Sequence, residues 1–217
     1  VPTSSDFIDA AGWPDLDWEH LALHHGLQKW VFDDRVPPSD FATFDAWKAA
    51  TQVYQAELLR HHIELLRRLK YRPAGGFCMF AFNDPAPVVS WSVLDHERVP
   101  KLGWRALRDA CAPVIVVADR PPDIVMPGQM LELDVHVVND LRQQIDPAVV
   151  DIQARWASGD RRWRFGGSVD ADDCSRVGTI ELEVPDTLGA LTFRLTLTAG
   201  ELTATNRYTT AVTVVPE

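Results

Sequence analysis

The fold class is decided by one apolar stretch with turn residues before it and polar side chains after it, Gly75-Gly76-Phe77-Cys78-Met79-Phe80-Ala81-Phe82-Asn83-Asp84. A continuous apolar run of this length predicts a strand that is buried on both faces, as in a parallel sheet or barrel. Asn83 and Asp84 then follow the carboxyl end of the strand, which is where ligands bind in parallel α/β folds. We therefore predict a ligand-binding site at this end of the strand.

Helical patterns flank the predicted strand. Apolar residues recur every three or four positions from about 43 to 69, and a shorter helix is expected from about 101 to 110. Helix, strand and helix in this order are typical of an α/β fold. Further upstream, Asp17 is placed to cap a helix that begins at Trp18, and Gly26 is placed to end it.

The chain changes character after about residue 113. Seven short segments rich in β-branched residues follow, several alternate strictly between apolar and polar positions, and turn residues separate them. These segments are 114–118, 131–138, 149–156, 163–165, 178–184, 191–197 and 209–215. The pattern predicts an antiparallel sandwich of the immunoglobulin type, without a disulfide. We therefore divide the chain into an α/β part, residues 1–112, and an immunoglobulin-like β-sandwich, residues 113–217.

Composition argues against several partners and cofactors. The formal net charge of −10 argues against nucleic acid, because phosphate binding needs a basic surface. Cys78, Cys111 and Cys174 are odd in number and far apart, which favours reduced thiols and a cytoplasmic location, with Cys78 as a small core residue. Adjacent histidines, as in His24-His25 and His61-His62, point to different sides of a helix and form no two-ligand face. We expect no metal, no cofactor and no membrane span.

Three motifs, taken in order, resemble glycoside hydrolase family 2, most closely its β-mannosidase-like branch. They are Phe80-Ala81-Phe82-Asn83-Asp84, Ser90-Trp91-Ser92-Val93-Leu94-Asp95 and Pro100-Lys101. In that family the eighth strand of the catalytic barrel commonly ends in an aromatic residue, a short spacer and Asn-Asp. A Ser-Trp-Ser segment and a Pro-Lys or Trp-Lys step then lead into the eighth helix. The following sandwich resembles the family's C-terminal β-domain, so the resemblance covers essentially the whole chain.

The resemblance implies the last helix–strand–helix portion of a (β/α)8 barrel in a retaining β-glycosidase of the β-mannosidase, β-galactosidase or β-glucuronidase type. Such enzymes use two glutamates, one as the nucleophile and one as the acid/base. The family carries them at the ends of the fourth and seventh strands, so both are expected upstream of Val1. We expect no catalytic residue in this chain and no activity of the chain alone. The resemblance also implies carbohydrate as the partner of the full-length protein, with sugar contacts from Phe80, Asn83, Asp84 and Trp91.

The four candidate sugar-binding residues also have structural interpretations. Phe80 is suited to packing inside a barrel, Asn83 and Asp84 to capping the following loop, and Trp91 to supporting that loop. The family often has Trp where Phe80 stands and Gln at the position of Ala81, which implies a changed sugar subsite. The alternative function is a non-catalytic carbohydrate-binding or protein-interaction module built on the sandwich. A single strand without its barrel exposes apolar surface, so self-association is expected.

Overall fold

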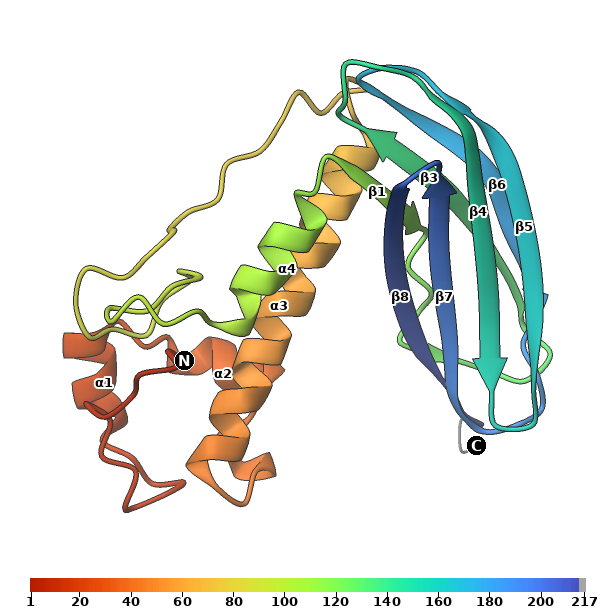
Figure 1. Ribbon diagram of the computed structural model, residues 1–217. Coiled ribbons are helices and arrows are strands. Elements are labelled where there is room, and N and C mark those ends of the chain that lie inside the picture. The colour runs from red at the N-terminus through yellow and green to blue at the C-terminus, as the bar shows by residue number, and fades with distance from the viewer. Residues whose placement is uncertain (215–217) are drawn as a thin grey trace. The chain divides into compact units, whose positions relative to one another are not determined.

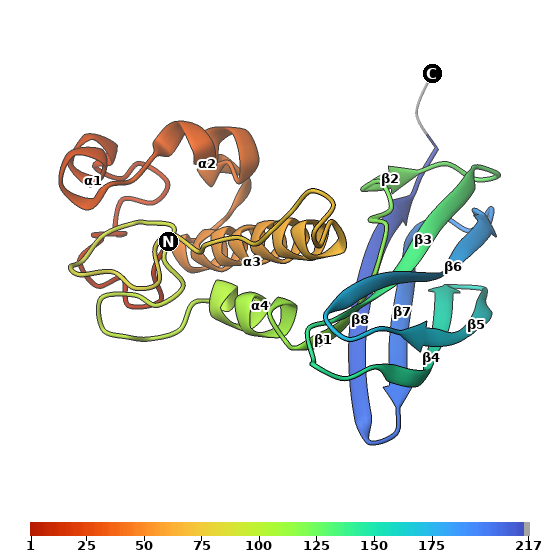
Figure 2. The same cartoon turned by 90° about the horizontal axis from the view of Figure 1, so that it is seen from above.

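The computed structural model describes residues 1–214, which form two compact units (Figures 1 and 2). The first unit comprises Val1–Leu65 with Gly76–Cys111, and the second comprises Leu66–Gly75 with Ala112–Glu217. Every described strand belongs to the second unit. The predicted combination of helices with a sandwich of β-sheets is therefore confirmed.

The helices are α1 (Trp18–His25), α2 (Lys29–Arg35), the 3-10 helix η1 (Pro38–Asp40), α3 (Phe44–Arg68) and α4 (Leu102–Ala110). Asp17 and Gly26 bound α1 as predicted. The Asp17 side chain accepts a hydrogen bond from the backbone of His20, and Gly26 takes a left-handed conformation at φ 68°. The two longer helix predictions are confirmed by α3 and α4. No helix was predicted at α2, whose N-cap Gln28 makes no capping bond with its side chain.

Trp47 is the centre of the hydrophobic core in the first unit. Its side chain has no exposed surface. Its ring packs against those of Trp13, Trp18 and Phe32 at centroid distances of 5.3, 5.8 and 5.1 Å. The indole N–H donates to the carbonyl of Val36 at 2.9 Å, so the polar edge of this buried ring is satisfied. These contacts explain why the aromatic-rich segment before α3 packs although much of it is irregular.

The last turns of α3 depart from the predicted apolar stripe. Leu65 and Leu69 are 41% and 39% exposed, whereas Arg67 is buried. The Arg67 guanidinium donates to the carbonyl of Ala112 and to the carboxylate of Asp140, both at 2.8 Å. The apolar periodicity therefore predicts the wrong buried residue at this end of α3, because Arg67 is buried by its polar partners rather than by apolar contacts.

The second unit is a sandwich of two sheets. Its strands are β1 (Val114–Ala118), β2 (Ile124–Val125), β3 (Met130–Asn139), β4 (Ile145–Trp156), β5 (Gly159–Val169), β6 (Asp173–Glu183), β7 (Gly189–Ala199) and β8 (Leu202–Val212). One sheet has the order β1-β3-β6, and the other has the order β2-β8-β7-β4-β5. Figure 1 shows β8, β7, β4 and β5 side by side. All pairings within the two sheets are antiparallel except that of β2 with β8.

All seven predicted strand segments are observed, most of them longer than predicted. The two-residue strand β2 was not predicted. The last predicted segment, 209–215, overlaps β8, and Val215 lies outside the described residues. Along β7 the residues Leu191, Phe193, Leu195 and Leu197 are fully buried, while the residues between them face outward. Burying one such side chain contributes about 1.5–3 kcal/mol, so strict alternation fixes which face of the strand meets the core.

The stretch that decided the predicted fold class is not a strand. Residues 75–82 form no regular pairing, and Phe77, Phe80 and Phe82 are 41%, 84% and 48% exposed. Cys78 is exposed as well, so the prediction of a buried strand with Cys78 in the core is wrong for this chain. Apolar character alone cannot make a strand, because backbone N–H and C=O groups need a neighbouring strand to pair with. Backbone pairing is limited to the end of the stretch, where the carbonyl of Phe82 accepts the N–H groups of Val93 and Leu94 and Asn83 forms an isolated bridge with Leu94.

Candidate functional site

A buried polar centre lies within the loop that follows the exposed stretch. Lys101 Nζ lies 3.2 Å from Asp84 Oδ2 and donates to Ser92 Oγ at 2.8 Å. The other carboxylate oxygen of Asp84 accepts a hydrogen bond from Ser90 Oγ. Burial lowers the pKa of Lys101, and the charge of Asp84 opposes that effect. Residues of all three predicted motifs therefore meet in one network, in which hydrogen bonds satisfy an otherwise costly buried ion pair.

Asp95 is a second carboxylate in the same loop, and it is also fully buried. Its Oδ1 accepts the backbone N–H groups of Glu97 and Val99 at 3.0 and 2.9 Å, and its Oδ2 accepts that of Ser4 at 2.7 Å. Burial alone raises the pKa of Asp95, but these hydrogen bonds outweigh burial and hold it below the ordinary value of 3.8. Asp95 therefore stays ionised and fixes the turn before α4.

The structure separates the four residues predicted to contact sugar. Asp84 is 2% exposed, and both of its carboxylate oxygens already have protein partners. The half-buried Asn83 donates its amide to the carbonyl of Asp84 at 3.3 Å. Phe80 is 84% exposed, and Trp91 is 47% exposed. Of the four, Trp91 alone lines the pocket of the first unit, and the sugar-binding role of each stays a prediction.

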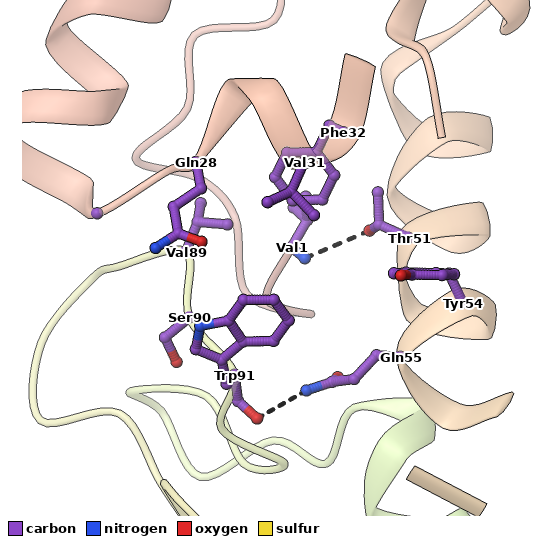
Figure 3. Close-up of a pocket in the computed structure, with 11 residues that line it drawn as sticks. Val1, Gln28, Val31, Phe32, Thr51, Tyr54, Gln55, Val89, Ser90 and Trp91 are labelled. Atoms are coloured by element: carbon purple, nitrogen blue, oxygen red, sulfur yellow. Dashed lines mark hydrogen bonds between the residues drawn. The ribbon is translucent and has the colours of Figure 1, made fainter. Parts of the chain in front are cut away.

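This pocket has a volume of about 60 Å³ and lies between α2, α3 and the loop at 89–91 (Figure 3). Its lining residues are Val1, Gly26, Gln28, Val31, Phe32, Thr51, Tyr54, Gln55, Val89, Ser90 and Trp91. Figure 3 shows the indole of Trp91 between Gln28 and Ser90 on one side and the α3 residues on the other. The Gln55 amide holds the loop by donating to the carbonyls of Trp91 and Ser92 at 2.8 and 3.0 Å.

The lining of the pocket combines apolar walls with a few polar groups. Phe32 and Trp91 supply apolar walls, while Gln28, Gln55 and Ser90 supply amide and hydroxyl groups. A few polar groups on an apolar surface are typical of sites for small polar ligands. None of the eleven lining residues carries a carboxylate, and retaining glycoside hydrolysis needs two. Neither Gln28 nor Gln55 was predicted as a site residue, because a single amide side chain gives no specific signal in the sequence.

The described residues also bear on three other kinds of feature, namely a metal site, a membrane-spanning helix and a disulfide. Within residues 1–214, no group of three or more His, Cys, Asp and Glu side chains is placed to hold a metal ion. The same range holds no helix long and apolar enough to cross a membrane. Cys78, Cys111 and Cys174 form no disulfide with one another. Burial raises the pKa of the Cys174 thiol to about 11, so this thiol is protonated at neutral pH.

Comparison with known proteins identifies the fold. The sequence matches no family model and no curated protein. The structure, in contrast, shares its fold with a part of several glycosidases, so the resemblance to glycoside hydrolase family 2 is confirmed at the level of the fold.

One of these structures is the β-D-mannosidase from Dictyoglomus thermophilum, with a TM-score of 0.61 and 22% identity over 77% of this chain. Two others are the exo-β-D-glucosaminidase CsxA and the Amycolatopsis orientalis exo-chitosanase CsxA. Their TM-scores are 0.65 and 0.64 and their identities 15% and 16%, each over 82% of this chain. The chain spans about one fifth of the length of each enzyme, since the matches cover 20% of those chains. Each match includes residues of both units, because neither unit alone makes up 77% of the chain.

Proposed function

We propose that this chain is the C-terminal part of a retaining β-glycosidase of glycoside hydrolase family 2, of the β-mannosidase-like branch. The observation that carries the proposal is the fold match to three glycosidases over 77–82% of the chain. The motif residues Asp84, Ser90, Ser92 and Lys101 also support it, because residues from all three motifs meet in one buried network. The substrate of the full-length protein is then a β-glycoside.

In this proposal residues 1–112 are the end of a (β/α)8 barrel, and residues 113–217 are an immunoglobulin-like C-terminal domain. The exposed residues 76–82 become the eighth barrel strand when the rest of the barrel is present. Three exposed phenylalanines and a backbone without ladder partners are what a strand shows when its neighbours are absent. Both catalytic glutamates then lie on chain that precedes Val1, and the location of the enzyme is cytoplasmic.

The proposal gives the candidate residues specific roles. Phe80 stacks against a sugar ring at the end of the completed strand, and Asn83 and Trp91 contact hydroxyl groups or the apolar face of the sugar. Asp84 holds the loop that carries Asn83 and Trp91 in place through its contacts with Ser90 and Lys101. Because the carboxylate of Asp84 is already occupied, we expect it to act mainly by positioning Asn83.

The test uses the full-length gene product together with the 217-residue chain. We expect the reading frame upstream of Val1 to encode the remainder of a barrel, ending in a strand that carries a glutamate. The full-length protein should hydrolyse a nitrophenyl β-glycoside with retention, and the 217-residue chain should not. A start codon directly before Val1, or retaining hydrolysis by the 217-residue chain, would overturn the proposal.

The second candidate function is a non-catalytic carbohydrate-binding or protein-interaction module. The observation that favours it is the pocket of the first unit, which has amide, hydroxyl and aromatic groups but no carboxylate. This function predicts that the 217-residue chain alone binds a neutral sugar and that Trp91→Ala removes this binding. Sugar binding by the isolated chain, together with an upstream sequence that encodes no barrel, would favour this candidate over the glycosidase.

A further inference from the structure

The outer face of the five-stranded sheet carries a transverse row of arginines. Arg162 on β5 lies opposite Gln153 on β4, Gln153 lies opposite Arg194 on β7, and Arg194 lies opposite Arg207 on β8. All three arginines are exposed. Arg194 and Arg207 lie on the face opposite the core because their neighbours along the strand are more buried, and Arg162 shares that face because it lies directly opposite Gln153. The row therefore runs across four strands that lie side by side in Figure 1.

Arg194 and Arg207 form a like-charge pair without a counter-ion. Directly opposite side chains on neighbouring strands lie close together, and like charges at such positions are destabilising. Among the described residues, neither guanidinium has a hydrogen-bond or ion-pair partner, whereas Arg162 pairs with Asp160 at 2.9 Å. This pair occurs in a chain with a formal net charge of −10. No described residue offsets the repulsion between Arg194 and Arg207, and an external anion bound between the two guanidinium groups would do so.

The positions beside the row are polar, and the described outward-facing residues of the sheet include no aromatic side chain. Thr192 and Thr209 flank the row on one side, and Thr196 and Thr205 flank it on the other. The hydroxyl groups of Thr192 and Thr209 lie 3.3 Å apart. The face also carries two carboxylates, Asp160 and Asp151, which are paired with Arg162 and Arg164 at the β5 end. At the β7–β8 end the face combines guanidinium groups with hydroxyl groups.

We propose that this face binds an anionic polysaccharide, with Arg194 and Arg207 together holding one of its carboxylate or sulfate groups. Guanidinium groups bind such anions with charge-assisted hydrogen bonds, and threonine hydroxyls suit a ligand rich in hydroxyl groups. The absence of aromatic residues on the face disfavours single-stranded nucleic acid, which needs stacking platforms. The positions directly beside the row on β4, β7 and β8 are threonine, aspartate or arginine, and the exposed Ile124 lies only at the edge on β2. A face with so little apolar surface next to the row disfavours a protein partner, since stable protein interfaces have an apolar core.

The spacing of the row fits a polymer better than a single small anion. Neighbouring strands lie about 4.8 Å apart, so Arg162 lies about 10 Å across the sheet from Arg194. A chain that places one acidic group at the Arg194–Arg207 pair can place another near Arg162. The proposal does not depend on the glycosidase function, because it rests only on the described surface of the second unit.

The experiment compares wild type with Arg194→Gln/Arg207→Gln in calorimetric titrations at low ionic strength. The probes are polygalacturonate for carboxylate, heparin for sulfate, dextran as the neutral polysaccharide and polyglutamate as the acidic polypeptide. We expect wild type to bind at least one of the two anionic polysaccharides, not dextran, and with an affinity that falls as salt is added. The double variant should lose about tenfold or more in affinity, since it removes two charge-assisted contacts.

Arg105→Gln/Arg142→Gln is the matched control, because it removes the same charge from two exposed positions outside the row. It should bind as wild type does. The Arg194→Gln/Arg207→Gln variant should also melt at the same temperature as wild type or higher, because the like-charge pair is gone. The proposal is overturned by a wild type that binds neither anionic polysaccharide, by equal losses in both double variants, or by polyglutamate binding as tightly as either polysaccharide.

Discussion

The ammonium group of Lys101 lies 3.2 Å from the carboxylate of Asp84, and neither side chain is more than 2% exposed. Asp84 begins the loop that contains Ser90 and Ser92, and Lys101 immediately precedes α4. The contact therefore fixes the two ends of this loop to each other. Because both charges are out of water, each one depends on the other for its stability in the fold.

Breaking this pair on one side should destabilise the first unit strongly. We expect Asp84→Asn or Lys101→Met to lower the free energy of unfolding by about 3–5 kcal/mol, because each leaves a buried charge without its partner. The double variant Asp84→Asn/Lys101→Met should lose less than the sum of the two. Urea unfolding followed by tryptophan fluorescence measures this, since Trp47 and its aromatic neighbours lie in the first unit.

The control for the buried pair is Asp33→Asn. It removes an exposed i,i+4 pair with Lys29, whose side chains are 40% and 48% exposed. Its effect should stay below about 1 kcal/mol. If Asp84→Asn behaves like Asp33→Asn, the buried pair does not support the fold.

Asp95 should make the first unit sensitive to acid. Its pKa is held below 3.8 in the folded chain by hydrogen bonds from backbone N–H groups. A lowered folded-state pKa contributes stability that is complete above 3.8 and is lost as the pH falls through the folded-state value. We expect Asp95→Asn to lower stability at neutral pH and to flatten the loss of stability in acid. Unfolding curves from pH 7 down to pH 3 measure both effects, and parallel curves for the two proteins would refute this role.

Asp140 should anchor the end of α3 within the second unit. Its carboxylate accepts Arg67 Nη2 at 2.8 Å and Lys70 Nζ at 2.7 Å. Burial alone lowers the pKa of Lys70, but the hydrogen bonds and charges of Asp140 and Asp172 outweigh burial and raise it, so Lys70 stays charged. Asp140→Ala should cost about 1–3 kcal/mol, because two largely buried cations lose their shared acceptor.

Hydrogen exchange of the strand amides in the second unit measures the effect of Asp140→Ala. The matched control is Asp109→Ala, which removes an exposed pair with Arg108. Protection of the strands should fall in Asp140→Ala and remain at the wild-type level in Asp109→Ala. Equal protection in both variants would show that Asp140 is not an anchor.

The exposed aromatic stretch should drive self-association of the 217-residue chain. Phe77 and Phe80 are 41% and 84% exposed within a segment that has no strand partner. We expect Phe77→Ser/Phe80→Ser to reduce light scattering and the binding of a hydrophobic dye, because it removes exposed apolar surface. Leu188→Ser, at a 53% exposed site on the second unit, is the control and should change neither. A monodisperse monomer without dye binding in the wild type would contradict the prediction.

The sequence by itself determined the elements whose cause is local. Asp17 and Gly26 bound α1 because capping involves residues within one turn of the helix end. The strands of the sandwich follow from alternation, as in β7, because a period of two assigns each side chain to the core or to solvent. The fold of the glycosidases was also recognisable, because the order of three short motifs is a property of the chain.

Only the tertiary structure decided the properties that depend on contacts between different segments of the chain, such as strand pairing, burial and ion pairing. Residues 75–82 have the composition of a buried strand, yet they form no ladder with another strand, because a strand exists only beside another strand. Arg67 is buried and Leu65 is exposed, because Asp140 and the carbonyl of Ala112 lie where the guanidinium can reach them. Asp84 was predicted to face a sugar, and the structure places its carboxylate against Lys101, a partner that spacing in the sequence does not reveal.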